Sequence, residues 1–103
     1  ARTAPGPGPG PAPPPSPRRY ASAALFTLAC VEPNAVLMAR HSGGAVLEAL
    51  RRVLLEDPID EARINASEAL FNMARNGAGS AAEGIGDHDG LLVALATAVL
   101  EDY

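Results

Sequence analysis

Apolar residues recur at helical spacing along most of the chain. Between residues 62 and 74 they fall at offsets of 4, 7, 8, 11 and 12 from the first, which predicts one apolar stripe on a helix of about four turns. This stripe consists of Ala62, Ala66, Ala69, Leu70, Met73 and Ala74. A second stripe consists of Val46, Leu47, Leu50, Val53 and Leu54. No useful length alternates at period two, so the pattern predicts an all-α fold.

Turn-forming residues separate the predicted helices. Pro58 ends the helix that carries the second stripe, and Asp60 is expected to cap the long helix that follows. Asn76 and Gly77 close that long helix. The chain is thereby divided into helices joined by short turns.

Two further helices flank this pair. A short one is expected from Asn34, in the capping position, to about His41, followed by a break at residues 42–44. The last segment, residues 90–103, repeats the second helix, and its apolar stripe is expected to consist of Leu92, Leu95, Ala96 and Val99.

The chain contains an internal repeat. Residues 21–29 match residues 66–74 at an offset of 45, with six of nine positions identical. The same offset carries residues 54–57 onto residues 99–102. A second match at one spacing indicates a true repeat, and a period of this size is typical of stacked helical hairpins.

Proline divides the composition in two, because eight of the ten prolines lie between Pro5 and Pro17. Residues 1–19 are therefore expected to form a disordered Pro/Gly-rich tail, since they offer no apolar face to offset the cost of ordering. Within this tail, Pro14, Pro17 and Arg19 stand in the order that SH3 domains bind. A plain linker or solubilising tail is the alternative interpretation.

Charge, the length of apolar stretches and cysteine content argue against nucleic-acid binding, a membrane span and a need for an oxidising compartment. Eight basic residues against 12 acidic ones give a net charge of −4, which argues against nucleic acid as a partner. No stretch approaches the length of apolar sequence that a membrane span needs. Cys30 is the only cysteine, so nothing requires an oxidising compartment, and a cytoplasmic or nuclear location is expected.

The order of these features resembles the armadillo repeat. A short helix, the Gly43-Gly44 turn, a longer helix, the Asp57-Pro58 turn and a long Ala-rich helix follow one another as in that family. Residues 69–74 are similar to its third-helix signature. The HEAT repeat is the alternative family.

This resemblance implies an all-α, right-handed superhelical solenoid fragment over residues 20–103. Residues 20–31 would be the third helix of one repeat and residues 34–76 one full repeat. Residues 79–103 would be the first two helices of the next. Because each repeat buries its stripe only against its neighbours, so short an array is expected to be marginal alone and to self-associate.

The resemblance also implies a groove for an extended peptide or protein, lined by the third helices. The residues expected to bind the partner are Asn65, Glu68, Asn72 and Arg75, with Thr27 on the adjoining helix. Asn72 stands where peptide-binding members carry an Asn that holds the peptide backbone. The alternative interpretation is that Asn72 only solvates an exposed helix face.

The groove also departs from the peptide-binding members. Glu68 and Ala23 stand where members that bind nuclear signals carry Trp, and Thr27 replaces an Asn. Recognition of a basic targeting peptide is therefore not implied.

Candidate catalytic chemistry is sparse. His41 and His88 both lie at a turn before a helix, where capping or surface roles are expected. Residues 87–89 are three adjacent metal-type ligands, which converge less well than ligands from separate elements. We therefore expect no enzyme activity, no metal and no cofactor.

Two functional classes follow. The first is a noncatalytic protein-interaction scaffold that presents a third-helix groove to a partner. The second is a purely structural spacer or regulatory segment within a larger assembly, such as a ubiquitin-ligase or kinase scaffold. A fold resemblance does not name the partner.

Overall fold

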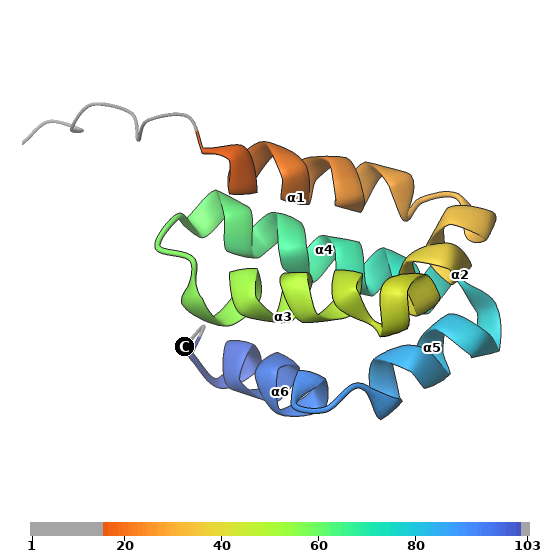
Figure 1. The fold of residues 1–103 in the computed structure, drawn as a ribbon. Coiled ribbons are helices and arrows are strands. Elements are labelled where there is room, and N and C mark those ends of the chain that lie inside the picture. Colours follow the sequence, from red (N-terminus) through yellow and green to blue (C-terminus); the bar gives the residue numbers. More distant parts are fainter. Residues whose placement is uncertain (1–15, 102–103) are drawn as a thin grey trace, which may run out of the picture.

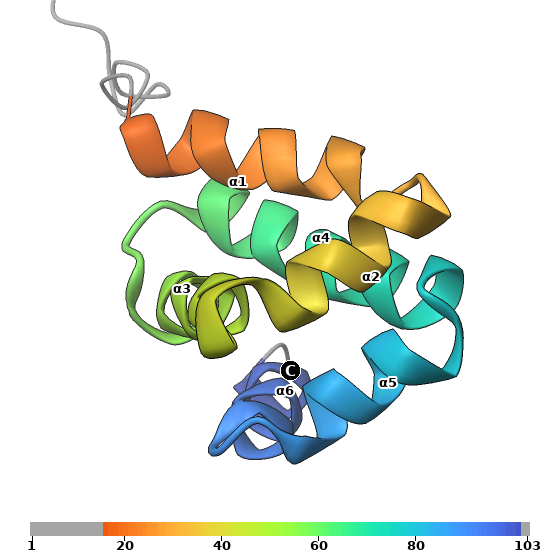
Figure 2. The same cartoon turned by 45° about the vertical axis from the view of Figure 1, so that its right-hand side comes forward.

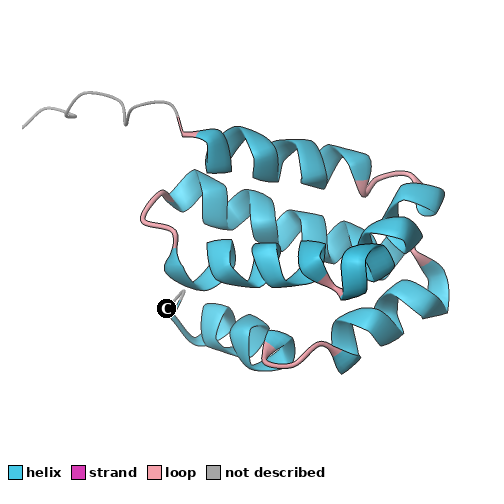
Figure 3. Cartoon of the chain, viewed as in Figure 1, coloured by secondary structure: helices cyan, strands magenta, loops and turns pink. Residues whose placement is uncertain are grey.

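The computed structural model describes residues 16–101, and these residues are helical throughout, joined by short turns (Figures 1 and 3). The elements are α1 (Pro17–Leu28), α2 (Glu32–Arg40), a 3₁₀ turn η1 (His41–Gly43), α3 (Ala45–Glu56), α4 (Asp60–Asn76), α5 (Ala78–Asp87) and α6 (Leu91–Glu101). The described part of the chain contains no strand, so the prediction of an all-α fold is confirmed. Most of the predicted tail lies outside the described residues.

The helices form a row in which α4 is central. Helix α1 lies beside α4 and runs in the same direction, while α3 packs on α4 and α6 packs on α3 (Figures 1 and 2). The short helices α2 and α5 pack on each other at one end of the row and close it. The internal repeat maps onto this arrangement, because residues 21–29 and 66–74 fall on α1 and α4.

The core depends on small side chains along α4. Ala62, Ala66, Ala69 and Met73 are fully buried, and Leu70 is almost so. Alanine adds no side-chain entropy cost and lets neighbouring helix backbones approach closely, which suits the helix with the most neighbours. The predicted stripe is confirmed at these positions, whereas Ala74 is exposed.

Three predicted helix starts are wrong. Helix α1 begins at Pro17 within the predicted tail, and α2 begins at Glu32 with Pro33 in its first turn instead of at an Asn34 cap. Proline suits a first turn, because its fixed φ is helical and the missing N–H has no partner there anyway. Helix α4 is preceded by Ile59 at the capping position, so Asp60 lies in the first turn and caps nothing.

Glycine is needed at two of the turns, for two different reasons. Gly43 and Gly44 have φ values of 66° and 95°, the left-handed region that the predicted break before α3 requires. Gly77 follows the end of α4, as predicted, in a close contact. A Cβ there would lie 2.2 Å from Ala81 Cβ and 3.2 Å from Ala35 Cβ, so any side chain would separate α4 from α2 and α5.

Only part of the predicted apolar stripe of α6 faces the core. Leu95 is half-buried and packs against the core, whereas Ala96 is exposed. Leu91 and Ala94 are fully buried, whereas Leu92 and Val99 are 59% and 63% exposed. The difference arises because α3 and α6 have different neighbouring helices. The matching residues of α3 are buried because α4 covers them, and no helix among the described residues covers α6 in the same way.

Asp57 joins α1 to the turn between α3 and α4. Its Oδ1 accepts the Ile59 N–H at 2.9 Å, its other oxygen accepts from Arg18 of α1, and its backbone carbonyl accepts from Arg63 Nη1 at 3.0 Å. Its side chain is only 1% exposed. Burial raises the pKa of Asp57, but the Ile59 N–H and the Arg18 guanidinium outweigh it, so the pKa lies below its ordinary value.

We expect Asp57→Ala to lower the free energy of unfolding by about 1–2 kcal/mol at pH 7, because it removes a turn cap and the partner of Arg18. A carboxyl whose folded pKa is depressed stabilises fully above its unfolded pKa of about 3.9, and this contribution is lost as the pH falls through the folded pKa. Urea unfolding at pH 7 and at stepwise lower pH measures both effects. The pH-dependent part should be smaller in Asp57→Asn, and the exposed Asp87→Asn is the matched control. An unchanged unfolding free energy in Asp57→Ala would contradict this role.

Candidate functional site

Three amide side chains of α4 hold α1 in place. The Nδ2 atoms of Asn65, Asn72 and Asn76 donate to the backbone carbonyls of Arg19, Phe26 and Ala29, at 3.3, 3.4 and 3.1 Å. The Phe26 and Ala29 carbonyls lie at the C-terminal end of α1, where carbonyls lack a backbone partner within the helix, so donors from α4 help to satisfy them. The Arg19 carbonyl lies in the first turn of α1 and also accepts from the Ser22 hydroxyl at 3.0 Å. The seam between α1 and α4 is therefore polar at its surface and close-packed beneath.

This seam places the residues predicted to bind a partner in two groups. Asn72 is only 7% exposed and also donates to Cys30 Sγ at 3.4 Å, and Asn65 is half-buried. Both amides are engaged within the chain. Binding of a partner by Asn65 and Asn72 therefore stays a prediction that needs these contacts to open.

The second group lies on the outer surface of the seam. Thr27 and Arg75 are exposed, and Glu68 is half-buried. The Thr27 hydroxyl donates to the Ala23 carbonyl at 3.0 Å, and the Arg75 guanidinium lies 5.9 Å from the Phe71 ring centroid. Within the described residues, Glu68 has neither a hydrogen bond nor an ion pair. This surface offers the unpaired carboxylate of Glu68 and the guanidinium of Arg75, about two helical turns apart.

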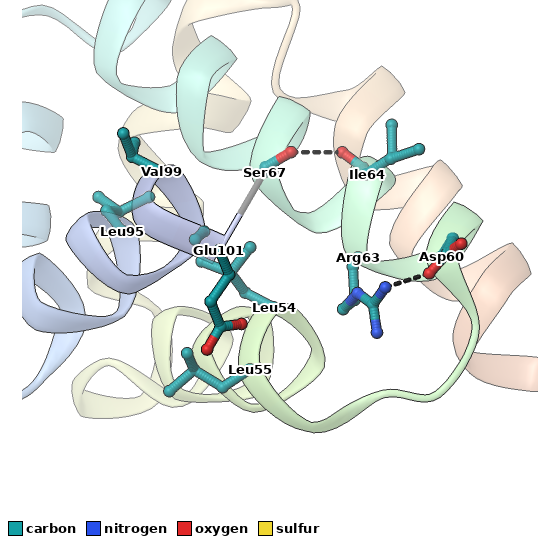
Figure 4. A pocket seen from close by; sticks show the side chains of 10 residues that line it. Leu54, Leu55, Asp60, Arg63, Ile64, Ser67, Leu95, Val99 and Glu101 are labelled. Atoms are coloured by element: carbon teal, nitrogen blue, oxygen red, sulfur yellow. Dashed lines mark hydrogen bonds and ion pairs between the residues drawn. The ribbon is translucent and has the colours of Figure 1, made fainter. Parts of the chain in front are cut away.

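A pocket that the sequence did not predict lies between α3, α4 and α6 (Figure 4). Its apolar lining comes from Leu54, Leu55, Ile64, Leu95, Ala98 and Val99. Asp60, Arg63, Ser67 and Glu101 complete it, with Asp60 and Arg63 joined in an ion pair. None of the predicted partner-binding residues lines this pocket. It could not be found from the sequence because it depends on which side of α6 remains uncovered.

A charged cluster ties α3 to the turn before α6. Glu48 accepts from Arg51 Nη2 at 2.7 Å and from Arg52 Nε at 3.0 Å, and its Oε1 lies 3.0 Å from His88 Nε2. Hydrogen bonds from Arg51, His88 and Arg52 hold the pKa of Glu48 well below its usual range. Every member has a partner within the chain, which indicates that the cluster serves to hold α3 to the turn before α6.

The described residues show no further chemical centre. Among residues 16–101, no group of three or more His, Cys, Asp and Glu side chains is placed to hold a metal ion. None of the helices in that range is long and apolar enough to cross a membrane. Comparison with protein-family models, with curated proteins and with solved structures found no match to this chain.

The predicted SH3 motif lies partly in α1. Pro14 falls outside the described residues, but Pro17 and Arg19 are in the first turns of α1, and Arg19 pairs with Glu61 at 2.8 Å. SH3 grooves bind a polyproline helix, so this motif would need the start of α1 to unwind.

We expect Asn72→Ala to lower the free energy of unfolding by about 1–2 kcal/mol, because it removes a buried amide and its hydrogen bond to the Phe26 carbonyl of α1. Amide hydrogen exchange should show the greatest loss of protection in α1. Glu68→Ala on the same helix has no such bond and serves as the control. If both variants unfold alike, the amide of Asn72 does not hold the seam.

Proposed function

We propose that this chain is a noncatalytic protein-interaction module, a segment of an armadillo-type right-handed solenoid that binds an extended peptide or protein. The observation that carries the proposal is the pair α1 and α4. These two helices carry the repeated sequence, lie side by side and run in the same direction. Repetition of one helix at a fixed offset produces the continuous surface on which solenoids bind extended partners.

The order of the elements gives further support. A short α2, the Gly43-Gly44 turn, α3, the turn at Asp57 and the long α4 follow as the armadillo resemblance implies. Helices α5 and α6 repeat the first two members of that series, and residues 54–57 match residues 99–102.

The outer surface of the seam would bind the partner through Glu68, Arg75 and Thr27. Glu68 and Arg75 lie seven residues apart on one face of α4, and the repeat offset carries them onto Ala23 of α1 and Cys30, two residues after its end. Small side chains on α1 leave room for a peptide backbone, and the two charged groups on α4 would fix its direction. The exposed Cys30 thiol suits a reducing compartment, either cytoplasm or nucleus.

A display library of random peptides tests this function directly. We expect the chain to select a family of peptides, and we expect Glu68→Ala and Arg75→Ala each to weaken their binding about tenfold, or about 1.4 kcal/mol. Both residues project from a helix surface, so thermal unfolding should stay unchanged. Val93→Ala, on the exposed side of α6, is the control.

The alternative function, a spacer or regulatory segment, gives a different result. Peptides would not be enriched, or their binding would be insensitive to both substitutions. Polar substitution of Leu50, Leu70 or Met73 should unfold the protein under either function, because all three are buried in the core.

A further inference from the structure

Two apolar surfaces face solvent at opposite ends of the row of helices. The α1 surface consists of Tyr20, Ala24, Leu28 and Val31, of which Tyr20 and Leu28 are 60% and 48% exposed. The α4–α6 surface consists of Ile64, Phe71, Leu92 and Val99. Phe71 is 59% exposed. Both surfaces expose large apolar side chains that a monomer would ordinarily cover.

The internal contact between α1 and α4 relates the two surfaces. Helix α1 packs mainly on α4, so its buried Ser22 and Ala29 and half-buried Phe26 face α4. The repeat offset carries these positions onto Ser67, Ala74 and Phe71, on the uncovered side of α4. The uncovered side of α4 thus carries the residues, identical in type, that α1 uses to contact α4.

The opposite half of that contact matches the α1 surface. Helix α4 meets α1 through Asn65 and Asn76, and Met73 is buried beneath. The same offset carries these three positions onto Tyr20 and Leu28 of α1 and onto Val31, which lies just before α2. The two exposed surfaces are therefore the two halves of one contact that already exists inside the chain.

Helix α6 also exposes apolar residues whose counterparts in α3 are buried. In α3, Leu47 and Leu54 are buried beneath α4, and their counterparts Leu92 and Val99 in α6 are exposed. A helix in the corresponding place would lie on both α4 and α6, over the pocket in Figure 4. The repeat thus specifies where that helix lies and which type of side chain it presents.

We propose that α1 of a second copy of this chain takes that place, so that copies associate head to tail. The α1 surface of one copy packs on the α4–α6 surface of the next. Helices α5 and α6 of one copy together with α1 of the next reproduce the arrangement of α2, α3 and α4. Arg18 and Arg19 are paired with Asp57 and Glu61 of their own copy.

The geometry distinguishes this contact from a symmetric dimer. Each copy contributes two different surfaces, so one copy can bind a neighbour at each end. A contact of this kind continues into rods or closes into rings. The Arg75 guanidinium lies against the Phe71 ring, so the surface that binds a second copy adjoins the outer seam that binds the peptide.

Sedimentation velocity of the full chain over a range of concentrations tests the proposal. We expect species larger than a dimer as the concentration rises. Leu28→Glu should disable the α1 surface and Phe71→Glu the α4–α6 surface, each weakening association about a hundredfold or more, because a charged side chain replaces a large apolar one in the contact. An equimolar mixture of the two variants should form a 1:1 dimer and nothing larger, because one intact contact remains.

Three results would overturn the proposal. The unsubstituted chain could stay monomeric at every concentration, either variant could associate alone, or the mixture could fail to form the dimer. Circular dichroism checks that the variants fold. If one does not, Val31→Glu and Ile64→Glu test the same two surfaces. Val93→Glu, away from both surfaces, should associate like the unsubstituted chain.

Discussion

Helix α1 is held to the rest of the protein mainly by α4, and this contact determines what every other surface can do. It joins close packing at Ser22 and Ala29 with amides that satisfy the carbonyls of α1. Small side chains form shallow ridges that restrain the sliding of two helices only weakly, whereas a side-chain amide and a carbonyl must meet at one register. The three Asn residues of α4 therefore set how far α1 lies along α4.

That register also separates polar from apolar surfaces. Because the amides turn inward, the outer seam is left to Glu68 and Arg75. On the far side of α4, Ile64 and Phe71 remain uncovered, as does the stripe of α6 that begins at Leu92. The outer seam thus suits the polar backbone of a peptide. The uncovered side of α4 suits the apolar face of another helix. A single helix, α4, separates the two.

The sequence predicted helices well because their signals are local. Apolar periodicity located α3 and α4, and the turns at Gly43-Gly44 and Pro58 followed from backbone chemistry that needs no neighbours. Burial in α6 was mispredicted because the same stripe is buried or exposed according to whether another helix covers it. The amide of Asn72 was assigned to a groove, since a helical wheel gives the angle of a side chain but not which neighbour it bonds. The start of α2 was missed because Pro33 was not recognised as a first-turn residue.

The contact between Asn72 and Cys30 has a practical consequence. Cys30 is the only thiol in the chain, so a thiol-directed dye reacts at one position, at the end of the seam. Its sulfur also lies 3.7 Å from the Phe26 carbonyl, which it shares as a partner with Asn72. Because Cys30 is exposed, the dye reacts without any opening of the seam, and the emission of a fluorophore at this position would report when the end of α1 moves away from α4.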